Sequence, residues 1–526
     1  MALLILFFTI LYFFLARFRL DWALLVLIFA LPSYLIRFKI FDLPSTLLEL
    51  MILICFFVWF FGHTEFKKFI RGEYNFKNFW QNYKKRIKYP FAIEIILILI
   101  ISYVAVAVSG FSVRALGIWR AYFFEPILLF IIIVNVFGPH IKQNRELRCN
   151  YDKCPLRFIL SRVKQLVWFQ KLASRNKDIK VFDSLEKIIL ALSLSALSIS
   201  LFGIWQNFSG ALWLEKWQAA GRITSVFPYP NALGLFLGPI VALLIGYLFG
   251  LVKYKKLLKK ENSQDKQILD KRLKQKIIFI FASIILSLTA IFLARSEGAL
   301  VGVLVAFLFM MFFWSSKSRA IIFVFVFLAI GIVLSSNDIQ QKVQQKIFLR
   351  DLSGEIRKQQ WRETWKMLTS SPSHFILGSG LAGYQTAIRP FHQEGIFFNK
   401  DNDPDFRRKI VIFNEKYKAE HWQPVEIYLY PHNIILNFWT EIGLAGAFLF
   451  LWLIVKYIDE ALFLRQYSEK YEQGVLLGLV GSMVVIMVHG LVDVPYFKND
   501  LAVLFWVLIA CLSILKLKKE IRNKIL

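Results

Sequence analysis

A histidine and an asparagine stand where a long apolar segment begins. His432 and Asn433 follow Pro431, and the apolar run continues to Ile458. Proline suits the first turn of a helix, where a missing N–H costs nothing, so we expect a helix to begin here. An imidazole with its ordinary pKa of about 6.5 can accept a proton near neutral pH. The pattern predicts a general base at a membrane surface, although a lone histidine in a membrane protein is more often structural.

Two arginines stand at turns between apolar runs. Arg222 opens the string RITSVFPYPNALG, and its guanidinium suits an anion at the interface through charge-assisted hydrogen bonds. An arginine that only snorkels toward water would give the same pattern. Arg295 lies in the short string ARSEG, where Glu297 could simply neutralise it. Both arginines are candidate ligands for a phosphate-bearing substrate.

A third arginine belongs to a long polar stretch. Arg362 and Trp365 fall on one face of a predicted helix, which is followed by Gly378, Gly380 and Gly383. Glycine-rich turns can aim backbone N–H groups at phosphate. The letters also fit the dinucleotide fingerprint G-x-G-x-x-G, but no strand-helix-strand unit surrounds them. We therefore expect Arg362 to assist in substrate binding and expect no nucleotide cofactor.

Acidic residues offer two further candidates. Asp493 lies in the string HGLVDVPYFKND between two apolar runs, where it could orient a base, pair with an arginine or form a simple polar turn. We assign it to the substrate site. The string from Asp401 to Asp405 has spaced carboxylates, yet it lacks the glycine and distal glutamate of a calcium loop. We therefore expect no metal.

Other catalytic signatures are missing from the sequence. It contains no P-loop, no H-E-x-x-H and no G-x-S-x-G string, so ATP hydrolysis, zinc proteolysis and serine-esterase chemistry have no support. The reaction must then use a preactivated donor. Arginines match a lipid diphosphate through bidentate bonds, and a neutral imidazole can take the proton of an acceptor hydroxyl.

The composition is that of a membrane protein. Of the 526 residues, 57% are hydrophobic and the mean hydropathy is +0.53, too apolar for a soluble protein of this length. The net charge of +28 is carried by Lys and Arg between apolar runs, where anionic lipid attracts them, so we expect no nucleic-acid partner. Cys149 and Cys154 form a C-x4-C pair without the second pair that a zinc site needs.

Apolar runs long enough, or nearly so, to cross the membrane recur along the chain. They show no period-two alternation, so we predict an all-α bundle of about 12–13 transmembrane helices. The runs lie near residues 2–16, 21–36, 43–62, 90–109, 118–138, 184–208, 226–252, 277–294, 298–315, 319–336, 431–458, 473–490 and 500–515.

The charge of the loops predicts the orientation. Basic loops at 63–88, 139–182 and 253–276 should be cytoplasmic. Alternation then places the loop 337–430 outside, together with every polar cluster described above. We divide the chain into N-terminal helices (1–183), central helices (184–336), the extracytoplasmic loop (337–430) and C-terminal helices (431–526).

The spacing around the histidine resembles that of a known family. Asn433 is followed after nine residues by Gly443 and after two more by Gly446. This H-N-x9-G-x2-G frame is similar to the signature of the O-antigen ligase family, which includes polysaccharide polymerases and protein O-oligosaccharyltransferases. The resemblance spans roughly residues 185–515 and includes the T-S-x-F and Pro-Asn that follow Arg222. The order in ARSEG departs from the Ser-Arg-Gly common in the family.

The resemblance implies a GT-C-like fold and a metal-independent glycosyltransferase of the inner membrane. Such an enzyme moves a glycan from undecaprenyl diphosphate to a hydroxyl of lipid A core, another lipid-linked glycan or a protein, in lipopolysaccharide or polysaccharide biosynthesis. The resemblance implies that His432 is the base with Asn433 beside it, that Arg222 and Arg295 bind diphosphate, and that Arg362 assists.

Two other classes of protein stay open. A transporter or flippase of lipid-linked glycan would also need arginines, but it should carry ionisable residues inside its spans or internal symmetry. Glu94 and Glu125 lie within or near apolar runs. The other class is a non-enzymatic scaffold of a polysaccharide assembly complex.

Overall fold

The computed structural model describes residues 2–40, 43–62, 89–139, 180–258, 266–401, 403–412 and 414–525. Within these ranges the chain is mostly helical, with two small antiparallel sheets, β1 with β2 and β3 with β4. The predicted all-α polytopic membrane fold is confirmed. The C-x4-C pair and most of the three basic loops fall outside the described residues.

The chain begins with a compact group of short apolar helices. Tyr12 donates a hydrogen bond to the carbonyl oxygen of Ala23 at 3.0 Å, so the first two helices form an antiparallel hairpin that turns near Arg19. The elements are α1 (Ala2–Phe18), α2 (Leu20–Phe29), the 3₁₀ turn η1 (Leu31–Leu35), β1 (Arg37–Ile40), β2 (Leu43–Thr46) and α3 (Leu47–Gly62).

Longer helices follow, and each predicted apolar run contains a helix, although the run 21–36 is divided between α2 and η1 and the run 43–62 begins with β2. In the described residues, nine helical segments are long and apolar enough to cross a membrane, and four shorter apolar helices accompany them. The elements outside the N-terminal group are α6 (Ala92–Val108), α7 (Val113–Trp119), the π turn η2 (Arg120–Phe124), α8 (Glu125–Phe137), α10 (Lys180–Ser209), α11 (Glu215–Ala219), α12 (Pro230–Leu258), α13 (Lys266–Leu293), α14 (Glu297–Trp314), α15 (Ser316–Leu334), α22 (Ile434–Gln466), α23 (Lys470–Gly490) and α24 (Asn499–Ile525).

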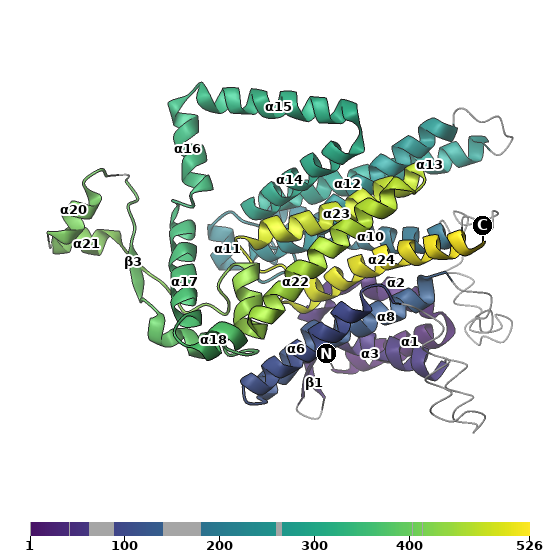
Figure 1. Ribbon diagram of the computed structural model, residues 1–526, viewed down its shortest axis with the longest axis horizontal. Helices are drawn as coiled ribbons and strands as arrows, with labels where there is room; N and C mark the ends of the chain where they lie inside the picture. The colour runs from purple at the N-terminus through teal and green to yellow at the C-terminus, as the bar shows by residue number, and fades with distance from the viewer. Residues whose placement is uncertain are drawn as a thin grey trace.

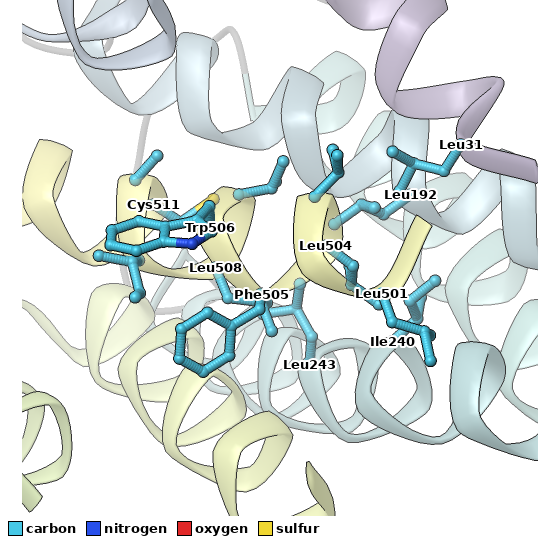
Figure 2. Close-up of a cluster of buried hydrophobic side chains, with 14 of the residues drawn as sticks. Leu31, Leu192, Ile240, Leu243, Leu501, Leu504, Phe505, Trp506, Leu508 and Cys511 are labelled. Atoms are coloured by element: carbon cyan, nitrogen blue, oxygen red, sulfur yellow. The ribbon is translucent and has the colours of Figure 1, made fainter. Parts of the chain in front are cut away.

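The last helix forms the centre of the bundle. Its most apolar window is 89% buried inside the protein, as expected for a helix that is hydrophobic on every side. Figure 2 shows Leu504, Phe505 and Trp506 of α24 pointing in different directions, with Leu192 of α10 and Ile240 of α12 among the surrounding side chains. A close-packed core of this kind fixes the positions of the helix ends.

Two helices face outward instead. The apolar window of α14 is 28% buried and that of α15 only 6%. In Figure 1, α15 runs apart from the other helices and meets α14 only where the two are joined. Nearly every side chain of α15 is therefore available to lipid, which explains why this helix is apolar all round without being in the core.

The two ends of the bundle differ in chemistry. At one end the tail of α24 forms ion pairs, Lys518 with Glu472 at 2.6 Å and Lys516 with Glu460 at 2.5 Å. These pairs join α24 to the start of α23 and to α22. The opposite end carries the starts of α12, α14 and α22 and the end of α23, and it holds the polar strings singled out in the sequence.

Residues 337–430 form a small helical domain at this second end, which we call the cap. Figure 1 shows α16 and α17 descending beside the bundle, with α20 and α21 farthest from it. The cap elements are α16 (Asn337–Ile347), α17 (Leu352–Leu368), α18 (Pro372–Leu377), α19 (Tyr384–Ile388), the 3₁₀ turn η6 (Arg389–Phe391), β3 (Gly395–Phe397), α20 (Phe406–Val411), α21 (Glu415–His421) and β4 (Trp422–Pro424).

A break in α22 joins the cap to the bundle. Ile442 and Gly443 leave the helical conformation, and Gly443 has φ +76° and ψ 174°. A Cβ atom on Gly443 would lie 2.6 Å from the carbonyl oxygen of Ile376 in α18. The break frees the carbonyl of Thr440, which accepts a hydrogen bond from the backbone N–H of Ser379 at 2.7 Å. The glycine thus allows the cap to dock against a membrane helix.

Candidate active site

The loop of Arg222 and the ARSEG turn are tied together by their own arginines. Arg222 donates from Nε to the carbonyl oxygen of Ala294 at 3.0 Å, and from Nη2 to Asn231 Oδ1 at 2.9 Å. In return, Arg295 donates from Nη1 to the carbonyl oxygen of Ala220 at 3.2 Å. Both guanidinium groups therefore lie at the junction of the two loops. Burial and the neighbouring positive charge of Arg295 lower the pKa of Arg222.

Local hydrogen bonds explain the Thr-Ser pair that follows Arg222. The backbone N–H groups of Thr224 and Ser225 both donate to Gln206 Oε1, at 3.1 and 3.0 Å. Ser225 has a positive φ of 54° and its hydroxyl donates to the carbonyl oxygen of Ile199 at 2.7 Å. The loop is thus fixed on α10, and Arg222 is held at its edge.

The acidic residue of the ARSEG turn does not neutralise its arginine. Glu297 accepts two bonds from Lys346 of α16, at 2.7 and 2.9 Å, and these bonds raise the pKa of Lys346. Arg295 has a positive φ of 49° and is exposed. Glu297 therefore links the start of α14 to the cap and is not the ion-pair partner of Arg295.

His432 sits beneath α17 in an unusual backbone conformation. Its φ is +47°, and its ring is edge-to-face with those of Tyr428 and Tyr430, with centroids 5.0 and 4.9 Å away. Its Nδ1 lies 3.0 Å from the amide oxygen Oε1 of Gln360. Since an amide oxygen only accepts, Nδ1 carries the proton and Nε2 is the basic nitrogen.

The surroundings of His432 keep it neutral. Burial is the main cause that lowers its pKa, and the positive charge of Arg357 adds to the effect, whereas the negative charge of Asp493 opposes it. A strained, non-glycine φ together with a lowered pKa is typical of a functional residue. A neutral imidazole with an unprotonated Nε2 is the form that a general base requires.

Asn433 has a positioning role. Its Oδ1 accepts from the N–H groups of Ile435 and Leu436, both at 3.0 Å, and its Nδ2 donates to the carbonyl oxygen of Leu491 at 3.1 Å. It is the N-cap of α22, a role in which asparagine is among the best residues. The helix therefore begins at Ile434, and the prediction that Pro431 lies in its first turn is wrong.

Asp493 joins the histidine to the arginines. Its Oδ2 accepts from Asn231 Nδ2 at 3.4 Å, and Asn231 in turn accepts from Arg222. The carboxylate is 2% exposed, and its Oδ1 accepts from the N–H of Val494 at 2.8 Å. The network runs from Arg222 through Asn231 to Asp493, whose charge acts on His432. The structure thus brings together five of the predicted site residues. They are Arg222, Arg295, His432, Asn433 and Asp493.

Three residues at this site were missed in the sequence, and two of them, Arg357 and Gln360, are on α17. Arg357 lies three residues before Gln360 and so on the same face of α17, and its charge acts on both His432 and Arg222. Its buried Nε has no hydrogen-bond partner among the described residues. The spacing of Arg357 and Gln360 in a polar helix was the available signal.

His489 is the third missed residue. It is 2% exposed at the end of α23, and a Cβ atom on Gly298 would lie 2.6 Å from its ring carbon Cδ2. The ARSEG turn therefore rests directly on this ring. The string HGLVD contained the signal, since the histidine lies four residues before Asp493.

Arg362 is placed elsewhere. It is five residues after Arg357, and helical geometry turns it to the opposite face of α17, where it lines a pocket of the cap. The glycine turn is also used differently from the interpretation in the sequence. The N–H groups of Ser379, Leu381 and Ala382 donate to Thr440, Ala105 and Glu441, so they are not available to phosphate.

The carboxylates considered for a metal are engaged within the cap. Asp403 accepts bonds from Lys409 at 2.6 Å and from Tyr417 at 2.7 Å, and these bonds lower its pKa to about 2. Asp401 lies 3.4 Å from Nε2 of His421. Across the described residues, no group of three or more His, Cys, Asp or Glu side chains is arranged to hold a metal ion.

The fold and the site define a polytopic membrane protein with three arginines, a neutral histidine and a buried aspartate gathered at one end of its bundle, under a helical cap. A family model described as O-antigen ligase matches residues 282–451. The resemblance inferred from the sequence is confirmed over this stretch, which holds Arg295, Arg357, His432 and Gly443. A search of curated proteins found no match for the chain.

Proposed function

We propose that this protein is a glycosyltransferase that moves a glycan from a polyprenyl diphosphate, in bacteria undecaprenyl diphosphate, to an acceptor hydroxyl. The observation that carries the proposal is the juxtaposition of His432, neutral and with Nε2 basic, and the cluster of Arg222, Arg295 and Arg357. A base and a polycationic site are the two parts that transfer from a diphosphate needs.

The proposed step has a simple balance. Nε2 of His432 takes the proton of the acceptor hydroxyl while the oxygen of that hydroxyl attacks the anomeric carbon of the donor. The bond between that carbon and the diphosphate oxygen breaks, and the polyprenyl diphosphate leaves with the electron pair. Arg222, Arg295 and Arg357 stabilise the negative charge that develops on the leaving group. Neither a metal ion nor a nucleotide takes part in this step.

The apolar surroundings suit the carrier. The donor's polyprenyl chain needs lipid contact beside the arginines, and the outward-facing α14 and α15 border lipid. We further propose that the cap and the site face the outside of the inner membrane. This placement rests on alternation from the basic loops predicted to be cytoplasmic.

The hypothesis that the protein is a transporter has less support than the glycosyltransferase. The two acids noted within or near apolar runs are paired, Glu94 with Lys456 at 2.7 Å and Glu125 with Arg120 at 3.2 Å. Such pairs stabilise helix packing and leave little charge for a transport path. No observation specifically favours a scaffold over an enzyme.

The test is transfer by the purified protein in nanodiscs. Undecaprenyl diphosphate oligosaccharide is incubated with an acceptor in the presence of EDTA, and product glycan and released polyprenyl diphosphate are measured by mass spectrometry. We expect both to appear in equal amounts with wild type, to persist in EDTA and to vanish with His432→Ala. His374→Ala is the matched control, at a cap histidine whose Nδ1 lies 3.0 Å from the hydroxyl of Ser370. Donor recovered intact, with movement between leaflets only, would identify a flippase.

A further inference from the structure

A pocket separate from the candidate active site lies in the cap, on the face of α17 turned away from His432. It has a volume of about 500 Å³ and is bounded by α17 on one side and by β3 and β4 on the other. None of the groups described in the proposed reaction lies in it. Its lining includes Gln359, Arg362, Gln393, Phe397 and Trp422, together with Glu355 and Glu394.

The polar wall of the pocket is held rigidly. Gln359 donates from Nε2 to Glu363 at 2.9 Å and to the amide oxygen of Gln393 at 2.7 Å. Glu363 also accepts from the backbone N–H of Gln393 at 2.9 Å, and it is only 3% exposed. The buried carboxylate thus orients the side-chain amide of Gln359, which in turn holds the amide oxygen of Gln393. Preorganised groups of this kind bind a ligand at low entropic cost.

The opposite wall is aromatic. The rings of Phe397 and Trp422 are 5.1 Å apart at an angle of 64°, and each side chain is about two-fifths exposed, at 40% and 41%. Gly395 makes this possible, because a Cβ atom there would lie 2.3 Å from the indole carbon Cζ2. The indole therefore packs on bare backbone and keeps an accessible surface. Exposed aromatic rings held in place this way favour a partly apolar ligand.

The charges of the lining exclude some ligands. Arg362 is exposed and has no ion-pair partner in the described part of the chain, whereas Glu355 is paired with Lys358 at 2.5 Å. Glu394 adds a further carboxylate to the lining. With Glu355 balanced by Lys358 and Glu394 beside Arg362, the lining has no excess of positive charge to hold a diphosphate. The lining suits a neutral ligand rich in hydroxyl groups, which can donate to carboxylates and accept from amides and guanidinium.

We infer that this pocket binds a sugar residue of a glycan substrate. A pyranose ring presents C–H groups on its faces and hydroxyls on its rim, which complements an aromatic wall facing amides, carboxylates and a guanidinium. The inference rests on the proposed function, since it names the kind of substrate that the cap holds. It gives Arg362 a role in sugar recognition and leaves the diphosphate to Arg222, Arg295 and Arg357.

The position of the pocket relative to His432 indicates how long the bound glycan must be. α17 separates the pocket from His432, and a helix with its side chains is about 10 Å across. A monosaccharide cannot contact both faces of the helix. The glycan bound here must therefore be an oligosaccharide, held by a sugar some residues away from the reacting end. The pocket predicts a preference for longer glycans, whichever substrate they belong to.

Binding and transfer are measured separately on the full-length protein in nanodiscs. The binding probe is the free oligosaccharide released by mild acid from the lipid carrier of the same cells, and calorimetry gives its Kd. We expect Trp422→Ala and Arg362→Ala each to raise the Kd at least tenfold. Gln393→Ala, a smaller change, should weaken binding in the same direction. Arg407→Ala, an exposed arginine in α20, is the control and should bind as wild type does. Wild-type Kd values for all three pocket variants would overturn the inference.

Steady-state transfer then identifies the substrate that uses the pocket. With one substrate saturating and the other varied, the pocket variants should raise KM for the bound substrate while kcat stays close to wild type. A raised KM for acceptor identifies the acceptor glycan, and a raised KM for donor identifies the donor glycan. Unchanged KM for both, at every glycan length, contradicts the inference while the proposed function stands. Saccharide binding without any transfer by wild type contradicts the proposed function and leaves the pocket supported.

Discussion

At the scale of single residues, the chemistry of the site depends on the residues that contact His432 or act on its charge. Gln360 fixes the proton on Nδ1, and Arg357 and Asp493 act on the ring with opposite signs. The sequence was sufficient to single out His432, Arg222 and Asp493, because their types and positions at the ends of apolar runs are unusual. It was not sufficient for Gln360 or Arg357, since a polar helix in a loop offers many such residues and only tertiary structure selects the face turned to the site.

Arg222→Lys tests the guanidinium geometry. Three hydrogen bonds leave Nε and Nη2 of Arg222, and an ammonium cannot reproduce this planar arrangement. Hydrogen bonds to charged groups are worth about 1.5–3 kcal/mol, so we expect kcat/KM to fall by roughly 10- to 150-fold. Arg319→Lys, on the exposed surface of α15, is the matched control. Equal kcat/KM for both variants would place diphosphate recognition elsewhere.

Charge variants around His432 should shift the acid limb of the pH–rate profile in opposite directions. Removing the positive charge with Arg357→Gln makes the imidazolium easier to form, so the pKa rises and activity is lost at a higher pH. Removing the negative charge with Asp493→Asn lowers the pKa, so activity persists to a lower pH. The profile of kcat against pH measures both. Shifts of the same sign would show that His432 is not the titrating group.

At the scale of elements, the break in α22 is what connects catalysis to the cap. Asn433 caps the helix, and the break ten residues later lets the glycine turn 378–383 bind it. The sequence predicted the helix and marked Gly443 by its spacing, but not the reason for the glycine. That reason is the approach of Ile376, a residue distant in sequence. Gly446 has a related role, because a Cβ atom there would meet the side chain of Ile442 at 2.3 Å.

Gly443→Ala tests the break. The φ and ψ of Gly443 are accessible to almost no other residue, and such strain costs about 1–3 kcal/mol before the clash with Ile376 is counted. We expect a lower thermal unfolding midpoint and loss of transfer. The control is Gly331→Ala in α15, where nothing lies within 4 Å of the added Cβ and helix propensity favours alanine by about 1 kcal/mol. Equal midpoints for the two variants would show that the break is not required.

At the scale of the whole molecule, the bundle divides into a buried centre and a lipid-facing flank. Hydropathy predicted the positions of the helices well, since each run had to satisfy its backbone in lipid. It could not distinguish α24 from α15, because both are apolar all round and only packing shows that one is central and the other exposed. The arrangement of the cap was also beyond the sequence, as its short elements depend on contacts with α6 and α22.

Cysteine labelling tests the orientation. In a background without native cysteines, Glu415→Cys in the cap should react with a membrane-impermeant maleimide added to intact cells with a permeable outer envelope. Lys274→Cys, near the start of α13, should react only after the membrane is opened. Both side chains are well exposed, at 77% and 56%, so accessibility within the protein does not limit either reaction. Equal labelling of both from outside would contradict the alternation of spans.

Turnover against pH, measured for wild type and His432→Gln, tests most directly whether His432 removes the proton of the acceptor hydroxyl. Burial and Arg357 lower the pKa of His432, so wild-type turnover should hold its plateau at neutral pH and fall only below about pH 6.5. Glutamine keeps a hydrogen bond to Gln360 possible but cannot accept a proton. We expect its turnover to be lower by about 10² to 10⁴ and to lose that acid limb, with donor binding unchanged. A His432→Gln enzyme that turns over at the wild-type rate, with the same pH profile, would contradict the account.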